Sequence, residues 1–153
     1  MLRSRISMIA LTVASAITGT AALPTSSGAA PMKTSAATRA SAAKFAAKQV
    51  GDPYRLGAVG PNAFDCSGLV DFAFRAAGTS LGVRTSQDMA RLGAHIRRAA
   101  IRPGDLIFTW SRGFGHVGMA VSATRYVHAP APGRRVTIAP IPAGAGLVAV
   151  RRP

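Results

Sequence analysis

The sequence contains no glutamate and only five acidic residues among 153, all of them aspartate. This largely excludes chemistry that depends on glutamate, such as the zincin general base, glutamate-ligated di-iron sites and the EF-hand loop. The chain also has a single cysteine, Cys66, which excludes an internal disulfide framework and a cysteine-rich zinc site. We therefore expect neither a metal ion nor another cofactor.

Positive charge is abundant, with 19 Lys and Arg residues and a formal net charge of +14. A chain with this charge adheres to polyanions. Anionic cell-wall polymers and membrane surfaces are the expected neighbours, and nucleic acid is not, because no nucleic-acid-binding motif accompanies the charge. The alternative is a compositional bias towards Arg and Ala that reflects the genome. A hydrophobic content of 48% indicates a folded chain, and the length allows one domain.

The first thirty residues have the pattern of a secretory signal peptide. Arg3 and Arg5 form a short basic region, which an uncharged stretch over residues 6–22 follows. Cleavage is expected near Ala22 or within residues 28–30. The alternative of a permanent membrane anchor is disfavoured, because the stretch is short and weakly hydrophobic for a span of about twenty residues. We interpret residues 1–30 as a signal peptide and 31–37 as a flexible linker, so the protein is expected to be secreted or cell-wall associated.

Residues 38–153 are expected to form one α+β domain. Three helices are predicted from helical spacing of apolar residues and from glycine end signals, over residues 38–50, 66–77 and 85–92. Strands are predicted over residues 106–110, 116–121, 125–129, 136–139 and 147–151. Because the helices come first and the strands later, the pattern indicates helices packed on one side of an antiparallel sheet.

The lone cysteine stands at the predicted start of the second helix, in the segment Asp65-Cys66-Ser67-Gly68. A helix N-terminus has unpaired N–H groups and a positive dipole end, which stabilise a thiolate. The alternative is a small buried hydrophobe, but an unpaired thiol is a liability in an exported protein. The sequence therefore predicts that Cys66 is an activated nucleophile.

Two of the three histidines are expected to meet near one end of a hairpin. His116 begins one predicted strand and His128 lies near the end of the next, so a short turn brings both to the same end. One imidazole can accept the cysteine proton while the other orients it. A metal-binding pair would need a third ligand, and only Cys66 is available. His95 stands among basic residues on an expected solvated edge and is left out of the site.

Over about residues 42–150, the sequence resembles the NlpC/P60 family of bacterial cell-wall cysteine peptidases. The resemblance rests on blocks that fall in the family's order and spacing: GDPYRLG (51–57), FDCSGLV (64–70), RTS (84–86), RPGDLIF (102–108), GHVGMAV (115–121) and YVHAPAPG (126–133). It implies a compact papain-like domain, with N-terminal helices packed on an antiparallel β-sheet. Two blocks depart from the family pattern: Arg55-Leu56 replaces an aromatic residue before glycine, and Gly82-Val83 replaces Leu-Pro. Both departures bear on groove shape and specificity.

The resemblance implies a role for each matching residue. Cys66 matches the nucleophile, His116 the general base and His128 the polar residue that orients the base. Tyr54 matches a tyrosine whose hydroxyl lies by the active site and helps to hold the oxyanion, with the backbone N–H of Cys66 as a second donor.

Three further residues, Asp65, Arg84 and Ser86, match positions that line the substrate groove in relatives. An aspartate beside the thiol suits the amino end of a stem peptide, but Asp65 is equally suited to capping the helix. Both alternatives stay open at this point.

The activity that the resemblance implies is that of an exported cysteine peptidase acting on peptidoglycan stem peptides through an acyl-enzyme. In the family the usual scissile bond joins D-glutamate to meso-diaminopimelate. The alternatives are an amidase or acyltransferase with the same Cys/His pair, and a non-catalytic basic wall-binding protein. A monomer is favoured.

Overall fold

The computed structural model describes residues 33–109 and 115–153. The predicted signal peptide, residues 1–30, lies outside the described residues. Helix α1 (Ala36–Ala47) begins two residues before the predicted start, so part of the predicted linker is helical. The Ser35 side chain explains this start, because its hydroxyl accepts the Thr38 N–H at 3.0 Å and caps the helix.

Two further helices follow, α2 (Cys66–Ala76) and α3 (Ser86–Met89). Helix α3 is shorter than the predicted 85–92, because the chain turns after Met89 to reach the edge of the sheet. The turn contains Gly93, whose φ is +57° and whose position leaves no room for a side chain: a Cβ there would lie 1.8 Å from the Arg152 carbonyl oxygen. Glycine is therefore required at this position.

Six antiparallel strands form one sheet in the order β1-β6-β2-β3-β4-β5. The strands are β1 (Ala94–His95), β2 (Leu106–Thr109), β3 (His116–Ala120), β4 (Arg125–His128), β5 (Thr137–Pro140) and β6 (Leu147–Arg152). Two short 3-10 helices, η1 (Arg98–Ala100) and η2 (Gly144–Gly146), lie in the connections. The five predicted strands are confirmed to within one residue at each end, except that the predicted end of the first, residue 110, lies outside the described residues. The two-residue β1 was missed because it is too short to show a period.

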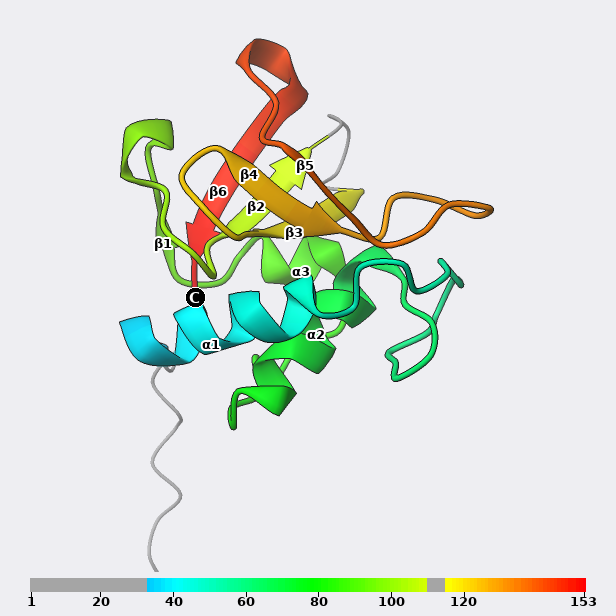
Figure 1. The fold of residues 1–153 in the computed structure, drawn as a ribbon. Helices are drawn as coiled ribbons and strands as arrows, with labels where there is room; N and C mark the ends of the chain where they lie inside the picture. The colour runs from blue at the N-terminus through cyan, green and yellow to red at the C-terminus, as the bar shows by residue number, and fades with distance from the viewer. Residues whose placement is uncertain (1–32, 110–114) are drawn as a thin grey trace, which may run out of the picture.

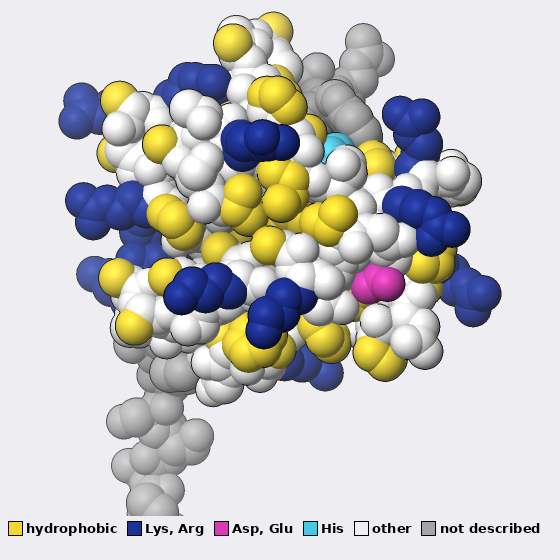
Figure 2. Space-filling model, in the orientation of Figure 1, with side chains coloured by type: hydrophobic (Ala, Val, Ile, Leu, Met, Phe, Trp, Pro, Cys, Tyr) yellow, Lys and Arg dark blue, Asp and Glu magenta, His cyan; other side chains and the backbone are white. Residues whose placement is uncertain are grey.

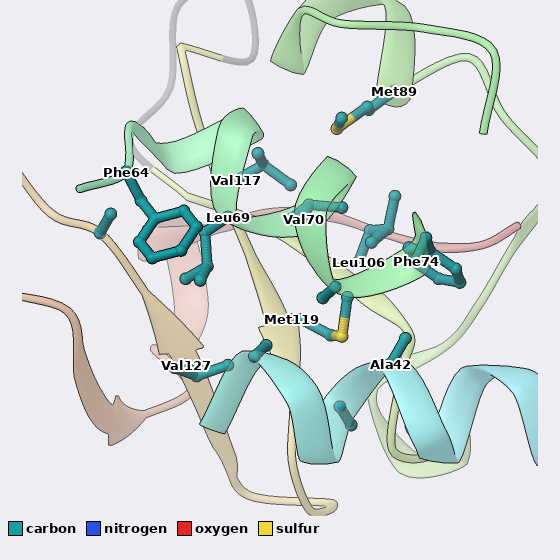
Figure 3. Packing of buried hydrophobic residues seen from close by; sticks show 14 of the residues in the cluster. Ala42, Phe64, Leu69, Val70, Phe74, Met89, Leu106, Val117, Met119 and Val127 are labelled. Atoms are coloured by element: carbon teal, nitrogen blue, oxygen red, sulfur yellow. The ribbon is translucent and has the colours of Figure 1, made fainter. Parts of the chain in front are cut away.

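The three helices pack on one face of the sheet, which confirms the predicted α+β architecture (Figure 1). The main core lies between these layers, where α1, α2 and three strands contribute buried side chains (Figure 3). Its largest members are Phe64, Phe74, Phe108, Leu69, Met89, Leu106 and Met119. A smaller cluster of Ile101, Ile107, Ala120, Tyr126, Ile141 and Val150 packs on the opposite face. Both faces of the central strands are therefore buried.

Alternation along β3 assigns its residues to these two faces. Val117 and Met119 belong to the core beneath the helices, and Ala120 belongs to the smaller cluster. Because side chains alternate along a strand, His116 and Gly118 share the face of Ala120.

Among the described residues, none of the helices is both long and apolar enough to cross a bilayer.

Candidate active site

Cys66 is the first residue of α2, and Asp65 is the N-cap of that helix. The Asp65 carboxylate accepts the Gly68 N–H at 2.6 Å, so the capping alternative is the one that the structure shows. The half-buried Cys66 sulfur receives a hydrogen bond from the backbone of Val117 at the start of β3. Because Val117 directly follows His116, the thiol of α2 and the imidazole of β3 come from adjoining points of the fold.

Burial dominates the electrostatics of the Cys66 thiol. Burial raises its pKa most, and the nearby Asp65 carboxylate raises it further, whereas backbone hydrogen bonds from Val117 and Ser67 lower it. The first effect dominates, because a thiolate loses more hydration than these N–H groups replace. Burial therefore opposes the thiolate stabilisation expected at the helix N-terminus, and the activation of Cys66 stays a prediction.

The two predicted site histidines are in direct contact. His116 Nε2 and His128 Nδ1 are 2.8 Å apart, and the rings meet edge to face at a centroid distance of 5.0 Å. The β3–β4 hairpin creates this contact, because its register pairs Met119 with Val127 and Ala120 with Tyr126. Only 3% of His116 and 6% of His128 is exposed, so the pair is shielded from water.

Both imidazoles are neutral at physiological pH. Burial lowers the pKa of His116 to about 4, and the neighbouring His128 lowers it further. Burial also lowers the pKa of His128 to about 4. In a neutral imidazole one nitrogen donates and the other accepts, so the 2.8 Å bond fixes complementary tautomers of the two rings.

Tyr54 lies beside the thiol because its segment pairs with the residues that precede α2. The Phe64 N–H donates to the Pro53 carbonyl at 3.1 Å, and the Arg55 N–H donates to the Phe64 carbonyl at 3.0 Å. Burial raises the pKa of the Tyr54 phenol, and charges on Cys66 and Asp65 raise it further. The Tyr54 phenol is therefore close enough to the Cys66 and Asp65 side chains to interact with their charges.

Next to Cys66, the buried Asp65 carboxylate forms an ion pair with the half-exposed Arg84. Arg84 Nη2 lies 2.7 Å from Asp65 Oδ2, and Arg84 Nη1 donates to Ser67 Oγ at 2.7 Å. The same Asp65 Oδ2 accepts the Gly57 N–H at 2.8 Å. The hydrogen bond to Asp65 is the main cause that raises the pKa of Arg84. Asp65 therefore ties together the cap of α2, the loop after Tyr54 and the segment before α3.

The structure places Ser86 within α3 rather than on the thiol. It is buried, its hydroxyl donates to the Gln87 side chain at 3.2 Å, and Thr85 is the cap of this helix. A role for Ser86 in substrate binding stays a prediction. His95 lies exposed on the edge strand β1, where the sequence placed it.

Sequence reasoning missed three residues around the site. Ser67 accepts a hydrogen bond from Arg84, Tyr126 stacks on His128 at a centroid distance of 4.5 Å, and Gly118 leaves space for the Tyr126 ring. The alternation that puts Tyr126 and His128 on one face was visible in the sequence, but it does not show which aromatic ring will lie flat on an imidazole. Over residues 33–109 and 115–153, no group of three His, Cys, Asp or Glu side chains is placed to hold a metal ion.

Known proteins are similar to this chain in sequence and in fold. The NlpC/P60 family model matches residues 51–145. A probable endopeptidase of Corynebacterium glutamicum is 41% identical over 81 residues, which are 53% of this chain and 38% of the relative. The murein DD-endopeptidase MepH of Escherichia coli is 36% identical over 97 residues, which are 60% of this chain and 36% of MepH. The chain thus spans less than two fifths of either relative.

A solved structure supports the same relationship. The peptidoglycan hydrolase RipB of Mycobacterium tuberculosis superposes with a TM-score of 0.65 at 29% identity, covering 75% of this chain and 64% of that structure. Because the family model spans more than half of the sequence and includes Cys66, His116 and His128, the chain belongs to the NlpC/P60 family, whose domains are papain-like.

Proposed function

We propose that this domain is a cysteine endopeptidase that hydrolyses amide bonds in peptidoglycan stem peptides. The observation that carries the proposal is the 2.8 Å bond between His116 and His128 at the point where Val117 binds the Cys66 sulfur. This arrangement supplies a nucleophile, a base and a group that orients the base. Relatives named murein endopeptidase and peptidoglycan hydrolase support the substrate class.

The reaction starts from a neutral thiol and a neutral imidazole. As the Cys66 sulfur attacks the amide carbonyl carbon, His116 Nδ1 takes the thiol proton, and a tetrahedral intermediate with an oxyanion forms. The Cys66 N–H and the Tyr54 hydroxyl are the donors for that oxyanion. His116 then gives the proton to the leaving amine, the C–N bond breaks and a thioester acyl-enzyme remains.

Water completes the cycle by the same proton route. His116 removes a proton from water, the resulting hydroxide attacks the thioester carbonyl, and the C–S bond breaks as the proton returns to sulfur. His128 accompanies both halves of the reaction by holding the His116 ring in place and by sharing the positive charge that develops on it. No cofactor takes part in this cycle.

The proposed scissile bond is that between D-glutamate and meso-diaminopimelate. Tyr54, Asp65, Arg84 and Ser86 are the proposed substrate-binding residues. Asp65 and Arg84 act mainly as a pair, since the Asp65 carboxylate is 5% exposed and already accepts three N–H groups. The half-exposed Arg84 is then the member of the pair that a substrate reaches.

Exposed basic side chains support a second part of the proposal, adherence to anionic wall polymers. Four of the five aspartates are already paired with an arginine, namely Asp65, Asp71, Asp88 and Asp105. Figure 2 shows many Lys and Arg side chains and few acidic ones on one face. Binding of the Cys66→Ala variant to isolated walls should weaken as salt rises. Retention that is unchanged between 0.05 and 1 M salt would contradict a role for charge.

Export through the N-terminal segment, with removal of about residues 1–30, is proposed from its sequence pattern. N-terminal sequencing of the protein recovered from culture medium or cell wall tests it, and an intact Met1 on that material would contradict cleavage.

Digestion of purified muropeptides, with products identified by mass, tests the activity. We expect Cys66→Ala and His116→Ala to be inactive, and His128→Ala to lose most activity while His128→Asn or His128→Gln recovers part of it, because an amide can also hold the His116 ring. His95→Ala is the matched control and should equal wild type. Products cut at the sugar–peptide bond would indicate an amidase instead. An active Cys66→Ala variant would refute cysteine catalysis.

A further inference from the structure

The His128 imidazole lies flat against a second buried ring. Tyr126 and His128 are two residues apart on β4 and face the same side of the sheet. Their ring centroids are 4.5 Å apart and their planes differ by 27°, which is stacking geometry. Tyr126 is 3% exposed and belongs to the smaller hydrophobic cluster, so its own orientation is fixed by packing.

Gly118 on the neighbouring strand provides the space for this stack. A Cβ at Gly118 would lie 2.5 Å from Tyr126 Cδ2, 2.7 Å from the Val127 carbonyl oxygen and 2.9 Å from His128 Cβ. The backbone of Gly118 does not have a positive φ, so glycine is needed here for space and not for its conformation. The Tyr126 ring therefore leans over Gly118, which no larger residue permits.

The phenol end of Tyr126 points towards β2. Thr109 lies near the Tyr126 hydroxyl and lowers its pKa, although burial raises that pKa more. Thr109 is also the register partner of His116 in the β2–β3 pair. The contacts thus run from Thr109 to Tyr126, from Tyr126 to His128 and from His128 to His116, across three adjacent strands.

We propose that Tyr126 is a positioning residue, which lies over Gly118 and fixes the ring plane of His128 so that its Nδ1 stays in line with His116 Nε2. The Tyr126 ring covers one face of the His128 ring and so restrains rotation of His128 about its side-chain bonds. Rotation of that ring would leave His116 present but misaligned. The catalytic consequence rests on the proposed function, whereas the structural one does not.

The effect of Tyr126 on the orientation of the His128 ring can be measured without substrate. Imidazole ¹⁵N chemical shifts show which nitrogen of each histidine carries the proton, and we expect one tautomer for His128 in the wild type and in Tyr126→Phe. Tyr126→Leu keeps an apolar side chain but removes the flat ring, and it should give a mixture of tautomers for His128. Ile141→Ala is the matched control, because it removes a buried side chain of the same cluster. An unchanged His128 signal in Tyr126→Leu would overturn the proposal.

The kinetic arm uses a defined stem peptide. Tyr126→Leu should lower kcat about 10-fold to 100-fold with KM within about 2-fold, because a misplaced catalytic group lowers the rate without weakening binding. Tyr126→Phe should stay within about 3-fold of wild type. The Tyr126→Leu effect should disappear in a His128→Ala background. An equal loss in both backgrounds, or an equal loss in Ile141→Ala, would overturn the proposal. If Cys66→Ala itself proves active, the proposed function fails, and the ¹⁵N shifts still decide the role of Tyr126.

Discussion

The protonation state of Cys66 can be measured without substrate, because it is the only cysteine in the chain. Iodoacetamide can therefore alkylate a thiol only at Cys66, and the Cys66→Ala variant serves as the negative control. The perturbation is pH, varied from 5 to 10, with the alkylation rate measured at each value. Only the thiolate reacts, so the rate follows the thiolate fraction.

The structure determines the expected size of the effect. An ordinary thiol with a pKa of about 8.5 is about 3% ionised at pH 7. Burial and the Asp65 carboxylate raise the pKa of Cys66 above its ordinary value, so less than this is thiolate. The rate should therefore rise at least about 30-fold between pH 7 and its plateau. A thiolate–imidazolium pair would instead react at a nearly constant rate from about pH 5 upwards.

Two references make the assay decisive. The same protein in urea should titrate near pH 8.5, and the folded protein should titrate at higher pH. His116→Ala should change the alkylation rate at pH 7 by less than about 3-fold, because the pKa of His116 is about 4 and the ring carries no charge to lose at that pH. A folded midpoint below that of the unfolded chain would refute the neutral pair, and so would a collapse of the rate in His116→Ala.

Three further predictions concern the same elements. The pKa of each site histidine is about 4 in the folded protein and 6.5 in the unfolded chain, so the unfolded chain binds more protons between these values. The free energy of unfolding should therefore be full above pH 6.5 and fall below it, by about 4 kcal/mol for the pair at pH 5. Urea unfolding of His128→Gln should show about half that loss. Gly68→Ala should lower the free energy of unfolding by about 3 kcal/mol or more, because the new Cβ would lie 2.0 Å from the Ala58 carbonyl oxygen. A melting temperature within about 2 °C of wild type would contradict this. Asp65→Asn should lower the pKa of Cys66 and speed its alkylation at pH 7.5, since the carboxylate raises that pKa; a slower reaction would count against this electrostatic account.

Local pattern was sufficient to predict most of the fold. The helix starting at Cys66 and the strand starting at His116 appear where capping and alternation placed them. The error at α3 has a tertiary cause, because Gly93 must pass close to the Arg152 carbonyl to allow β1 to pair with β6. Nothing in residues 85–92 themselves signals a partner that lies about sixty residues further along the chain.

The sequence was sufficient to predict which residues form the candidate site, but not the pKa shifts of those residues. Hairpin geometry was enough to bring His116 to His128, and the 2.8 Å contact bears that out. The upward pKa shift of Cys66 could not be predicted, because a helix N-terminus is visible in the sequence, whereas burial against β3 is not. Burial is a property of the assembled layers, and it reverses the sign of the pKa shift that the helix alone would give.

A buried aspartate next to a nucleophilic thiol needs an explanation, because its charge opposes the thiolate. Asp65 raises the pKa of Cys66, yet it caps α2, holds Gly57 and binds Arg84. These bonds fix the position of Cys66 at the start of α2. The Asp65 carboxylate therefore positions the sulfur, although its charge raises the pKa of the thiol. Arg84 offsets part of the cost, because its guanidinium lies on Asp65 and interacts favourably with charge on Cys66. In the proposed mechanism, proton removal accompanies attack by the thiol, so the alignment of His116 by His128 bears directly on the rate.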